Sequence, residues 1–191
     1  MLQRLIFFFL FLTALNAHAQ PGWTWEQLPD MPEGVSNNAV VQAYAGDSLC
    51  VYSFGGIDSS LLPSGIHLKS WRYNTVSQLW TAIPDMPDTQ GKIAAGASTI
   101  NNLIYVVGGY YVSDDLQEWS SDNVHIFDPE SNSWLADAAP IPVAIDDQVQ
   151  AVWNDSLLFV VTGWSDNSNV NNVQIYDPAN NNWQEGTQLS N

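Results

Sequence analysis

The segments LIYVVGG, residues 103–109, and IFDPESNSW, residues 126–134, decide the fold of this chain. The first is a short, continuous apolar run that ends in two glycines, which is typical of a strand buried on both faces. The second places Phe127 seven positions before Trp134, with a polar stretch beginning Asp-Pro between them. Because Asp, Pro and Asn favour tight turns, we expect two antiparallel strands joined by a short connection.

Both segments occur three times, about 50 residues apart, which indicates a repeat architecture. The apolar runs are LCVYSFGG (49–56), LIYVVGG (103–109) and LLFVVTG (157–163). The Trp segments are RYNTVSQLW (72–80), IFDPESNSW (126–134) and IYDPANNNW (175–183). Each apolar run follows a polar turn and a further predicted strand, AVVQAYA (39–45), AAGASTI (94–100) or VQAVW (149–153). Four strands per repeat, with small residues on the first and bulky residues on the last, predict the blades of a β-propeller.

The order of these residues resembles the kelch motif: an apolar run closed by two glycines, an aromatic residue before Asp-Pro, and a Trp six positions after the Asp. The third copy departs from the motif at Thr162, where the first glycine is expected. The resemblance implies an all-β, kelch-type β-propeller with three four-stranded antiparallel blades in an open partial ring. It also implies that the glycine pair lets the neighbouring blade approach and that the Trp fills the space between blades.

The segment WTWEQLPDMP, residues 23–32, resembles WTAIPDMP at residues 80–87, but it lacks the long run of alternating and apolar residues that precedes the second copy. In kelch rings such an N-terminal segment commonly supplies the outer strand of the last blade. We therefore expect half of a propeller, completed by missing C-terminal sequence or by a second copy of the chain as a homodimer. The predicted divisions are a signal peptide (1–19), an orphan N-terminal closing strand (20–32), and blades at 33–87, 88–142 and 143–191.

The N-terminus has the pattern of a secretory signal peptide, with Arg4, the apolar run LIFFFLFLTAL (5–15) and the small-residue pattern Ala17-His18-Ala19. Cleavage after Ala19 would give a secreted or periplasmic protein. The apolar run is too short for a comfortable membrane span, so no membrane insertion is expected. The formal net charge of −16 makes nucleic acid and anionic membranes poor partners.

No catalytic or metal-binding pattern emerges from the sequence, and we expect no cofactor. Kelch propellers include copper-radical galactose oxidases, whose site needs two His, two Tyr and a Cys, and this set is not found at recognisable positions. His125 is expected to be a tolerated strand residue, with metal ligation as the alternative, and Cys50 a small buried residue.

Candidate binding residues come from loops that should open on the glycine-pair side of the ring. Residues 57–67, 110–122 and 164–170 follow the apolar runs, and the second and third of these stretches contain Tyr110 and Trp164. Loops leading into the first strands bring Asn38, Lys92 and Asp146 to roughly equivalent positions, with Asp147 beside Asp146. Two roles are open to Lys92: holding a substrate carboxylate, or neutralising Asp146 and Asp147.

These features favour a secreted, non-catalytic kelch recognition module that binds a glycan or a protein through this face. The alternative is a carbohydrate-active enzyme similar to the periplasmic kelch mutarotase that equilibrates sialic acid anomers, an N-acetylneuraminate epimerase. A third interpretation is a non-functional fragment of a longer propeller protein.

Overall fold

The computed structural model describes residues 24–190. The predicted signal peptide and the start of the predicted closing strand lie outside this range. No helix among the described residues is long and apolar enough to cross a membrane.

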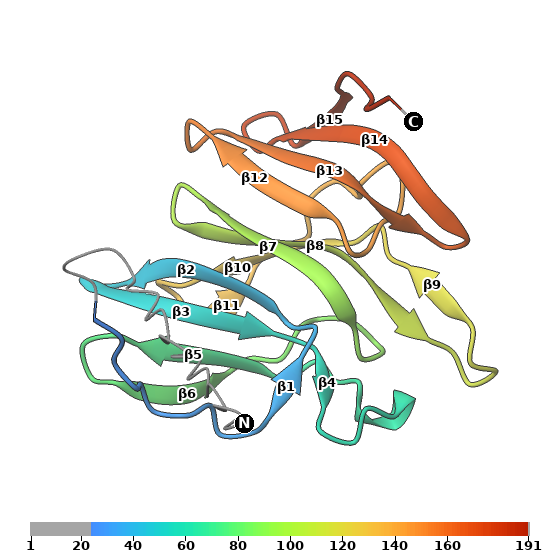
Figure 1. Ribbon diagram of the computed structural model, residues 1–191. Helices are drawn as coiled ribbons and strands as arrows, with labels where there is room; N and C mark the ends of the chain where they lie inside the picture. Colours follow the sequence, from blue (N-terminus) through green and yellow to red (C-terminus); the bar gives the residue numbers. More distant parts are fainter. Residues whose placement is uncertain (1–23, 191) are drawn as a thin grey trace, which may run out of the picture.

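The described chain forms three four-stranded antiparallel sheets, which confirms the predicted blades (Figure 1). Blade 1 consists of β2 (Ala39–Ala45), β3 (Ser48–Phe54), β5 (Ser70–Asn74) and β6 (Leu79–Ile83). Blade 2 consists of β7 (Ile93–Ile100), β8 (Leu103–Val112), β10 (Val124–Asp128) and β11 (Ser133–Trp134), with β9 (Glu118–Ser120) paired to β8. Blade 3 consists of β12 (Val149–Trp153), β13 (Leu157–Ser165), β14 (Ser168–Asp177) and β15 (Asn182–Glu185). The remaining elements are the pair β1 (Val35–Ser36) and β4 (Ile57–Asp58), and the short 3-10 helix η1 (Pro63–Gly65).

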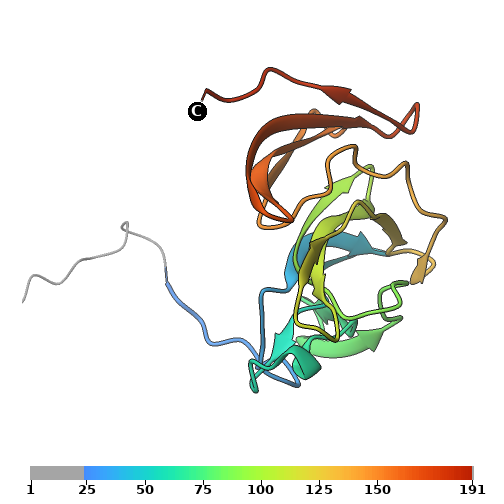
Figure 2. The same ribbon diagram turned by 90° about the vertical axis from the view of Figure 1, so that its right-hand side faces the viewer.

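The blades follow one another in chain order, with the inner strands β2, β7 and β12 side by side (Figures 1 and 2). Backbone hydrogen bonds join the entry points of these strands. The Ala94 N–H donates to the Asn37 carbonyl at 2.9 Å, and the Asp147 N–H donates to the Ala94 carbonyl at 3.1 Å. All three residues have positive φ, between 51° and 57°. Asn37, Ala94 and Asp147 are therefore equivalent positions in successive blades.

Aromatic side chains fill the space between blades, as the kelch resemblance implied. Trp134 packs on Phe127 and Phe54 with ring centroids 5.1 and 5.3 Å apart, and its Nε1–H donates to the carbonyl of Pro84 in the preceding linker. Trp183 packs on Tyr176 and donates in the same way to the Ala139 carbonyl. Cys50 is fully buried in the core between blades 1 and 2, as predicted.

The glycine pairs mark the points where the linker to the next blade passes close to a blade. A Cβ on Gly55 would lie 2.7 Å from the Lys92 carbonyl oxygen, and the Gly56 N–H donates to that carbonyl at 2.9 Å. Gly109 makes the same bond to the Ile145 carbonyl in blade 2. Gly55 also has φ of +60°, so a side chain is excluded for both steric and conformational reasons.

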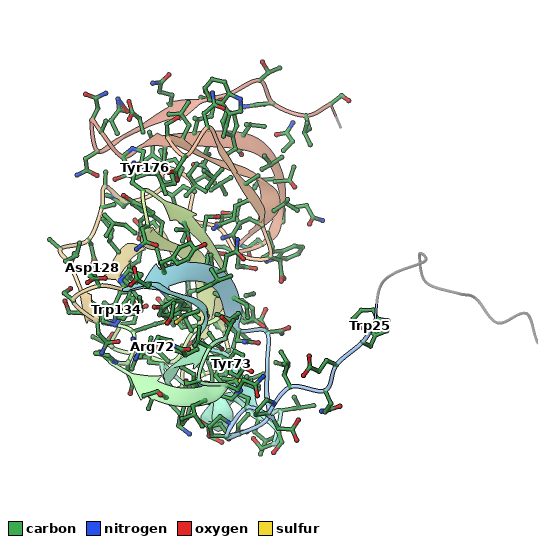
Figure 3. The ribbon with its side chains drawn as sticks, turned by 90° about the vertical axis from the view of Figure 1, so that its left-hand side faces the viewer. Trp25, Arg72, Tyr73, Asp128, Trp134 and Tyr176 are labelled. Carbon is green, nitrogen blue, oxygen red and sulfur yellow. The ribbon has the colours of Figure 1, made fainter. Side chains whose placement is uncertain are left out.

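The predicted closing segment forms no strand over its described part, and Trp25 is 96% exposed on a stretch that leads away from the blades (Figure 3). Its later residues nevertheless occupy a defined place, because the Trp80 Nε1–H donates to the Pro29 carbonyl at 3.1 Å. Trp134 and Trp183 make the same bond to the end of the preceding blade. Residues near Pro29 thus take the place of the outer end of a blade that would precede blade 1.

Two of the three predicted loops on the glycine side contain strands that extend the blades. β8 continues through its glycines to Val112 and pairs with β9, bringing Tyr111 opposite Trp119. β13 similarly continues to Ser165 and turns directly into β14. Aromatic cross-strand pairs favour such extensions. The glycine side of blades 2 and 3 therefore carries projecting hairpins where the sequence suggested loops.

Candidate functional site

Four of the six predicted binding residues gather where the hairpins of blades 2 and 3 meet. Asp146 and Trp164 exchange two backbone hydrogen bonds, of 2.9 and 2.8 Å. Tyr110 lies near the same carboxylates: burial raises the pKa of its hydroxyl, and the negative charges of Glu118, Asp147 and Asp146 raise it further. The structure thus brings Tyr110, Asp146, Asp147 and Trp164 into one region.

Ser120 connects the two hairpins. Its hydroxyl donates to Asp146 Oδ2 at 2.5 Å and accepts the Asp166 N–H at 2.8 Å, while its own N–H donates to Asp166 Oδ1 at 3.0 Å. These bonds join β9, the linker into blade 3 and the β13–β14 turn. The side chains on the two hairpins therefore have a rigid backbone support.

The exposed part of this region is acidic and aromatic. Burial raises the pKa of Asp146 despite the Ser120 hydrogen bond that lowers it, and the charges of Asp147, Glu118 and Asp166 add to the rise. Trp119 and Trp164 remain 47% and 37% exposed. We call this region the acidic hairpin surface, defined by Glu118, Trp119, Asp147, Trp164 and Asp166.

The other two predicted residues lie elsewhere. Lys92 is 3% exposed and pairs with Asp88 Oδ2 at 2.7 Å, so the expectation that it neutralises Asp146 and Asp147 was wrong. Asn38 is half-buried in blade 1, where its amide donates to the Ser53 hydroxyl at 2.8 Å. Asn38, Lys92 and Asp146 are also not equivalent positions, because the backbone bonds align Asn37 with Ala94 and Asp147.

The sequence analysis missed a buried ionic network around His125. Its Nε2 lies 2.9 Å from Asp88 Oδ2 and its Nδ1 lies 2.8 Å from Asp137 Oδ1, and the residue is 2% exposed. Ionised carboxylates only accept hydrogen bonds, so this arrangement suits an imidazolium that donates from both nitrogens. Burial lowers the pKa of His125, but the bonds to Asp88 and Asp137 outweigh burial and raise it.

Asp88 is the centre of this network. It accepts from Lys92 and His125 through Oδ2, and from the Asn123 amide through Oδ1 at 2.7 Å. Burial raises the pKa of Asp88, but the His125 hydrogen bond and the Lys92 charge outweigh burial and hold that pKa well below its usual range. Asp88 is therefore an ionised carboxylate with three donors.

An internal comparison of the repeats could have indicated this network. Gln174 occupies in blade 3 the position of His125 in blade 2, two residues before the strand aromatic. Its amide forms two hydrogen bonds with the backbone of Val143, of 2.8 and 3.1 Å. Val143 follows Pro142 as Asp88 follows Pro87. The residue at this position thus binds the incoming linker in both blades. His125 does so through an ionic hydrogen bond in blade 2, and Gln174 does so through amide hydrogen bonds in blade 3.

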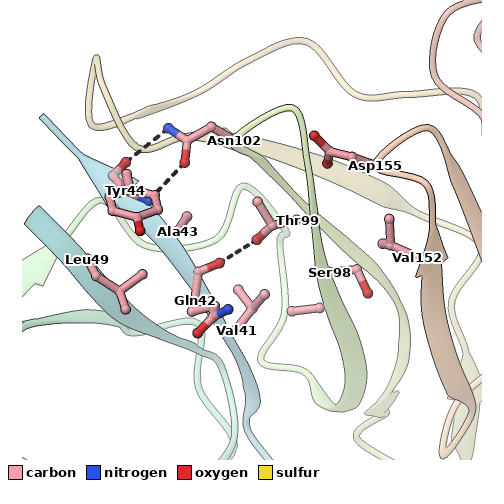
Figure 4. A pocket seen from close by; sticks show the side chains of 11 residues that line it. Val41, Gln42, Ala43, Tyr44, Leu49, Ser98, Thr99, Asn102, Val152 and Asp155 are labelled. Carbon is pink, nitrogen blue, oxygen red and sulfur yellow. Dashed lines mark hydrogen bonds between the residues drawn. The ribbon is translucent and has the colours of Figure 1, made fainter. Parts of the chain in front are cut away.

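A cavity of about 560 Å³ lies along the inner strands (Figure 4). Its walls carry hydrogen bonds between blades 1 and 2. The Asn102 amide bridges the backbone of Tyr44 through bonds of 2.8 and 3.1 Å, and the Thr99 hydroxyl donates to the Gln42 carbonyl. Asp155 is the one ionisable carboxylate on this wall. Within residues 24–190 no group of three or more His, Cys, Asp or Glu side chains is placed to hold a metal ion.

A family model described as the Kelch motif matches residues 94–135 and 153–190. The chain is a kelch-repeat β-propeller chain. The matched regions cover most of blades 2 and 3, whereas the Trp segment of blade 1 lacks the Asp-Pro turn.

Curated kelch proteins align with large parts of this kelch chain. Kelch-like protein terF of Aspergillus terreus is 28% identical over 170 residues, which are 83% of this chain and 34% of terF. Kelch-like protein 25 of Xenopus tropicalis is 30% identical over 139 residues, which are 70% of this chain and 22% of that protein. The chain therefore spans about a third or less of these relatives.

Among solved structures, that of YjhT superimposes with a TM-score of 0.66 at 17% identity, covering 85% of this chain and 54% of YjhT. At this identity the similarity establishes the shared propeller fold.

Proposed function

We propose that this kelch chain is a non-catalytic recognition module that binds a protein ligand through the acidic hairpin surface. The observation that carries the proposal is the exposure of Trp119 and Trp164 on two hairpins that Ser120 holds together. Large aromatic side chains on a rigid support lose little conformational entropy on binding and commonly dominate interface energetics. Kelch-repeat propellers provide such a support, which favours a protein-binding role.

The charge of the surface indicates the chemistry of the ligand. Glu118 precedes Trp119 in the chain, the Trp164 Nε1–H donates to the Asp166 carbonyl, and the charges of Glu118, Asp147 and Asp166 all act on Asp146. The chain as a whole carries a net charge of −16. Such a field attracts cationic partners and repels anionic ones. The ligand we propose is therefore a protein segment that combines Lys or Arg with an apolar anchor.

The test compares variants at opposite ends of the blades. Affinity capture from the extracellular proteins of the source organism would use the wild type, the double variant Trp119→Ala/Trp164→Ala and the control Trp153→Ala. Trp153 is 57% exposed, on the hairpin at the other end of blade 3. We expect the ligand to be retained by the control and lost by the double variant. Equal capture by all three proteins would refute the proposed surface.

We also propose that the protein is exported, on the basis of Arg4, the apolar run and the Ala17-His18-Ala19 pattern. Expression of the full chain in a bacterial host should give an exported protein whose N-terminal residue is Gln20. Recovery of an intact N-terminus in the cytoplasmic fraction alone would contradict export.

The mutarotase alternative has no comparable support. It requires a cation whose charge is free for the substrate carboxylate, whereas the charge of Lys92 is offset by Asp88 at 2.7 Å. An NMR anomerisation assay on sialic acid is expected to give no rate above background.

A further inference from the structure

Lys92 is a charged residue at a place where the scaffold accepts an apolar side chain. The Lys92 carbonyl accepts the Gly56 N–H, and the Ile145 carbonyl accepts the Gly109 N–H, so the two residues occupy the same place in successive repeats. Ile145 is fully buried in the core between blades 2 and 3, and Lys92 is 3% exposed. Burying an ammonium group costs free energy even when it is paired with Asp88, and a buried charge beside a cavity is a candidate for a role beyond the scaffold.

The side chain of Lys92 lies against a cavity of about 260 Å³ on the glycine side of blade 2. Asp88, Tyr111, Ser121 and Asn123 also line this cavity. The Lys92 Nζ donates to Asp88 Oδ2 at 2.7 Å and to the Ser121 hydroxyl at 3.0 Å. Asn123 adds a bond from its amide to Asp88 Oδ1 and one from its N–H to the Ser121 hydroxyl. The polar wall is thus built from buried side chains that support one another.

This wall combines donors and acceptors at short range, which is the pattern that recognises hydroxyl groups. An ammonium group offers three N–H donors, of which Asp88 and Ser121 engage two. A carboxylate next to it accepts hydrogen bonds. Two neighbouring hydroxyl groups on one ring match both the ammonium donor and the carboxylate acceptor, because each hydroxyl can accept and donate a hydrogen bond. Tyr111 contributes an aromatic side chain, which suits the C–H face of such a ring.

The charge of the site and the volume of the cavity restrict the class of ligand further. The Asp88 carboxylate offsets the Lys92 charge, and the strongly negative chain opposes anionic ligands. The cavity is slightly smaller than the 300–1,000 Å³ or so that is usual for drug-sized ligands, so a single ring fits better than a larger molecule.

We propose that the Lys92 pocket binds one neutral, polyhydroxylated ring, such as a neutral monosaccharide unit of a glycan. Lys92 donates to a ring hydroxyl, Asp88 accepts from its neighbour, and Tyr111 packs on the ring. This site is separate from the acidic hairpin surface and does not depend on the proposed protein ligand.

The repeat supplies a matched variant for the test. Lys92→Ile places the blade 3 residue at the blade 2 position, so the fold should tolerate it. Saturation-transfer NMR and calorimetry would use the methyl glycosides of glucose, galactose, mannose and N-acetylglucosamine, with N-acetylneuraminic acid as the anionic comparison. We expect the wild type to bind at least one neutral glycoside. Lys92→Ile should bind it at least about tenfold more weakly, the loss of one charged hydrogen bond, while its circular dichroism spectrum stays that of the folded wild type.

Tyr111→Ser provides a second variant among the lining residues and should weaken binding of the same glycoside. Trp164→Ala, which changes the acidic hairpin surface but not the partner of Tyr111, should leave glycoside binding unchanged and keeps this test independent of the protein-binding surface. The proposal fails if no neutral glycoside binds at millimolar concentration, or if Lys92→Ile binds as the wild type does. Tighter binding of N-acetylneuraminic acid than of every neutral glycoside would also overturn it.

Discussion

Asn132 and Asn181 occupy the same place in blades 2 and 3, five residues after the strand aromatic, with φ of 52° and 47°. The Asn181 side-chain oxygen accepts the Ala139 N–H and the Tyr176 hydroxyl, each at 2.7 Å. The corresponding oxygen of Asn132 is buried without a partner. The residues that correspond to Ala139 and Tyr176 in blade 2 are Pro84, which has no N–H, and Phe127, which has no hydroxyl. One residue type thus has two different environments in the same fold.

Alanine at these two positions should have unequal effects. Both variants place alanine at a positive φ, so the free-energy cost of that backbone conformation cancels in the comparison. Asn181→Ala also leaves two donors without their acceptor, the hydroxyl of buried Tyr176 and the N–H of half-buried Ala139. We expect Asn181→Ala to lower the free energy of unfolding by about 1–3 kcal/mol more than Asn132→Ala. Urea denaturation of both variants measures the difference, and equal losses would contradict it.

Thr162 is a β-branched residue with φ of 52°, at the first position of the glycine pair. Such a conformation costs about 1–3 kcal/mol, which exceeds the entropic cost of glycine. We expect Thr162→Gly to raise the free energy of unfolding by about 1 kcal/mol. The control is Gly163→Ala, which should destabilise, because its Cβ would lie 2.5 Å from the Asp146 carbonyl oxygen. A destabilised Thr162→Gly protein would show that the threonine is not strained.

At the scale of elements, the His125 network fastens two linkers to strand β10. Asp88 belongs to the linker that enters blade 2, and Asp137 belongs to the linker that leaves it. Lys92 also faces Asp88, and its positive charge opposes protonation of His125. Because the folded pKa of His125 is raised above its ordinary value of 6.5, the network stabilises the fold most when His125 is charged.

This arrangement predicts a pH dependence of stability. The contribution of His125 should be fully present below pH 6.5 and should be lost as the pH rises through the higher folded pKa. The free energy of unfolding, measured in urea across this interval, should therefore fall more steeply in the wild type than in His125→Gln. Gln is the residue at the equivalent blade 3 position, Gln174. Parallel pH profiles for the two proteins would exclude a charged His125.

The strands were largely predictable from the sequence because each is specified by local pattern. AVVQAYA and VQAVW coincide with β2 and β12. The hairpin formed by β8 and β9 was not predictable, because it depends on Tyr111 meeting Trp119 across a turn. The His125 network joins residues 37 and 12 positions apart through linkers without periodic pattern. Position within the repeat, rather than local sequence, is the signal that identifies it.

At the scale of the whole molecule, blades 1 and 3 each carry exposed apolar side chains on the face that points away from blade 2. We call these the outward faces. Val40 and Tyr44 are each 54% exposed on β2, and Val149 and Trp153 are 67% and 57% exposed on β12. The inward faces of the same strands contribute Ala39, Ala43 and Val152 to the cores between blades. Exposed apolar sheet faces favour association with other chains, whereas the net charge of −16 opposes it.

We therefore expect the purified chain, without the predicted signal peptide at 1–19, to self-associate as protein concentration and salt increase. Val149→Lys should weaken this association by placing a charge on the outward face of blade 3. Val76→Lys changes a residue that is 76% exposed in the β5–β6 turn and should have no effect. Sedimentation velocity measures the response, and a monomer at every concentration and salt would contradict the expectation.

The backbone bonds that link Asn37, Ala94 and Asp147 have a consequence for the gene. Blades 1 and 2 and blades 2 and 3 are joined by the same backbone bond at these positions, so Ala94 and Asp147 are equivalent junction points. Recombination between their codons would insert or delete one whole blade while keeping this backbone bond at the junction. Blade number can thus change in a single genetic event that preserves the backbone geometry where one blade meets the next.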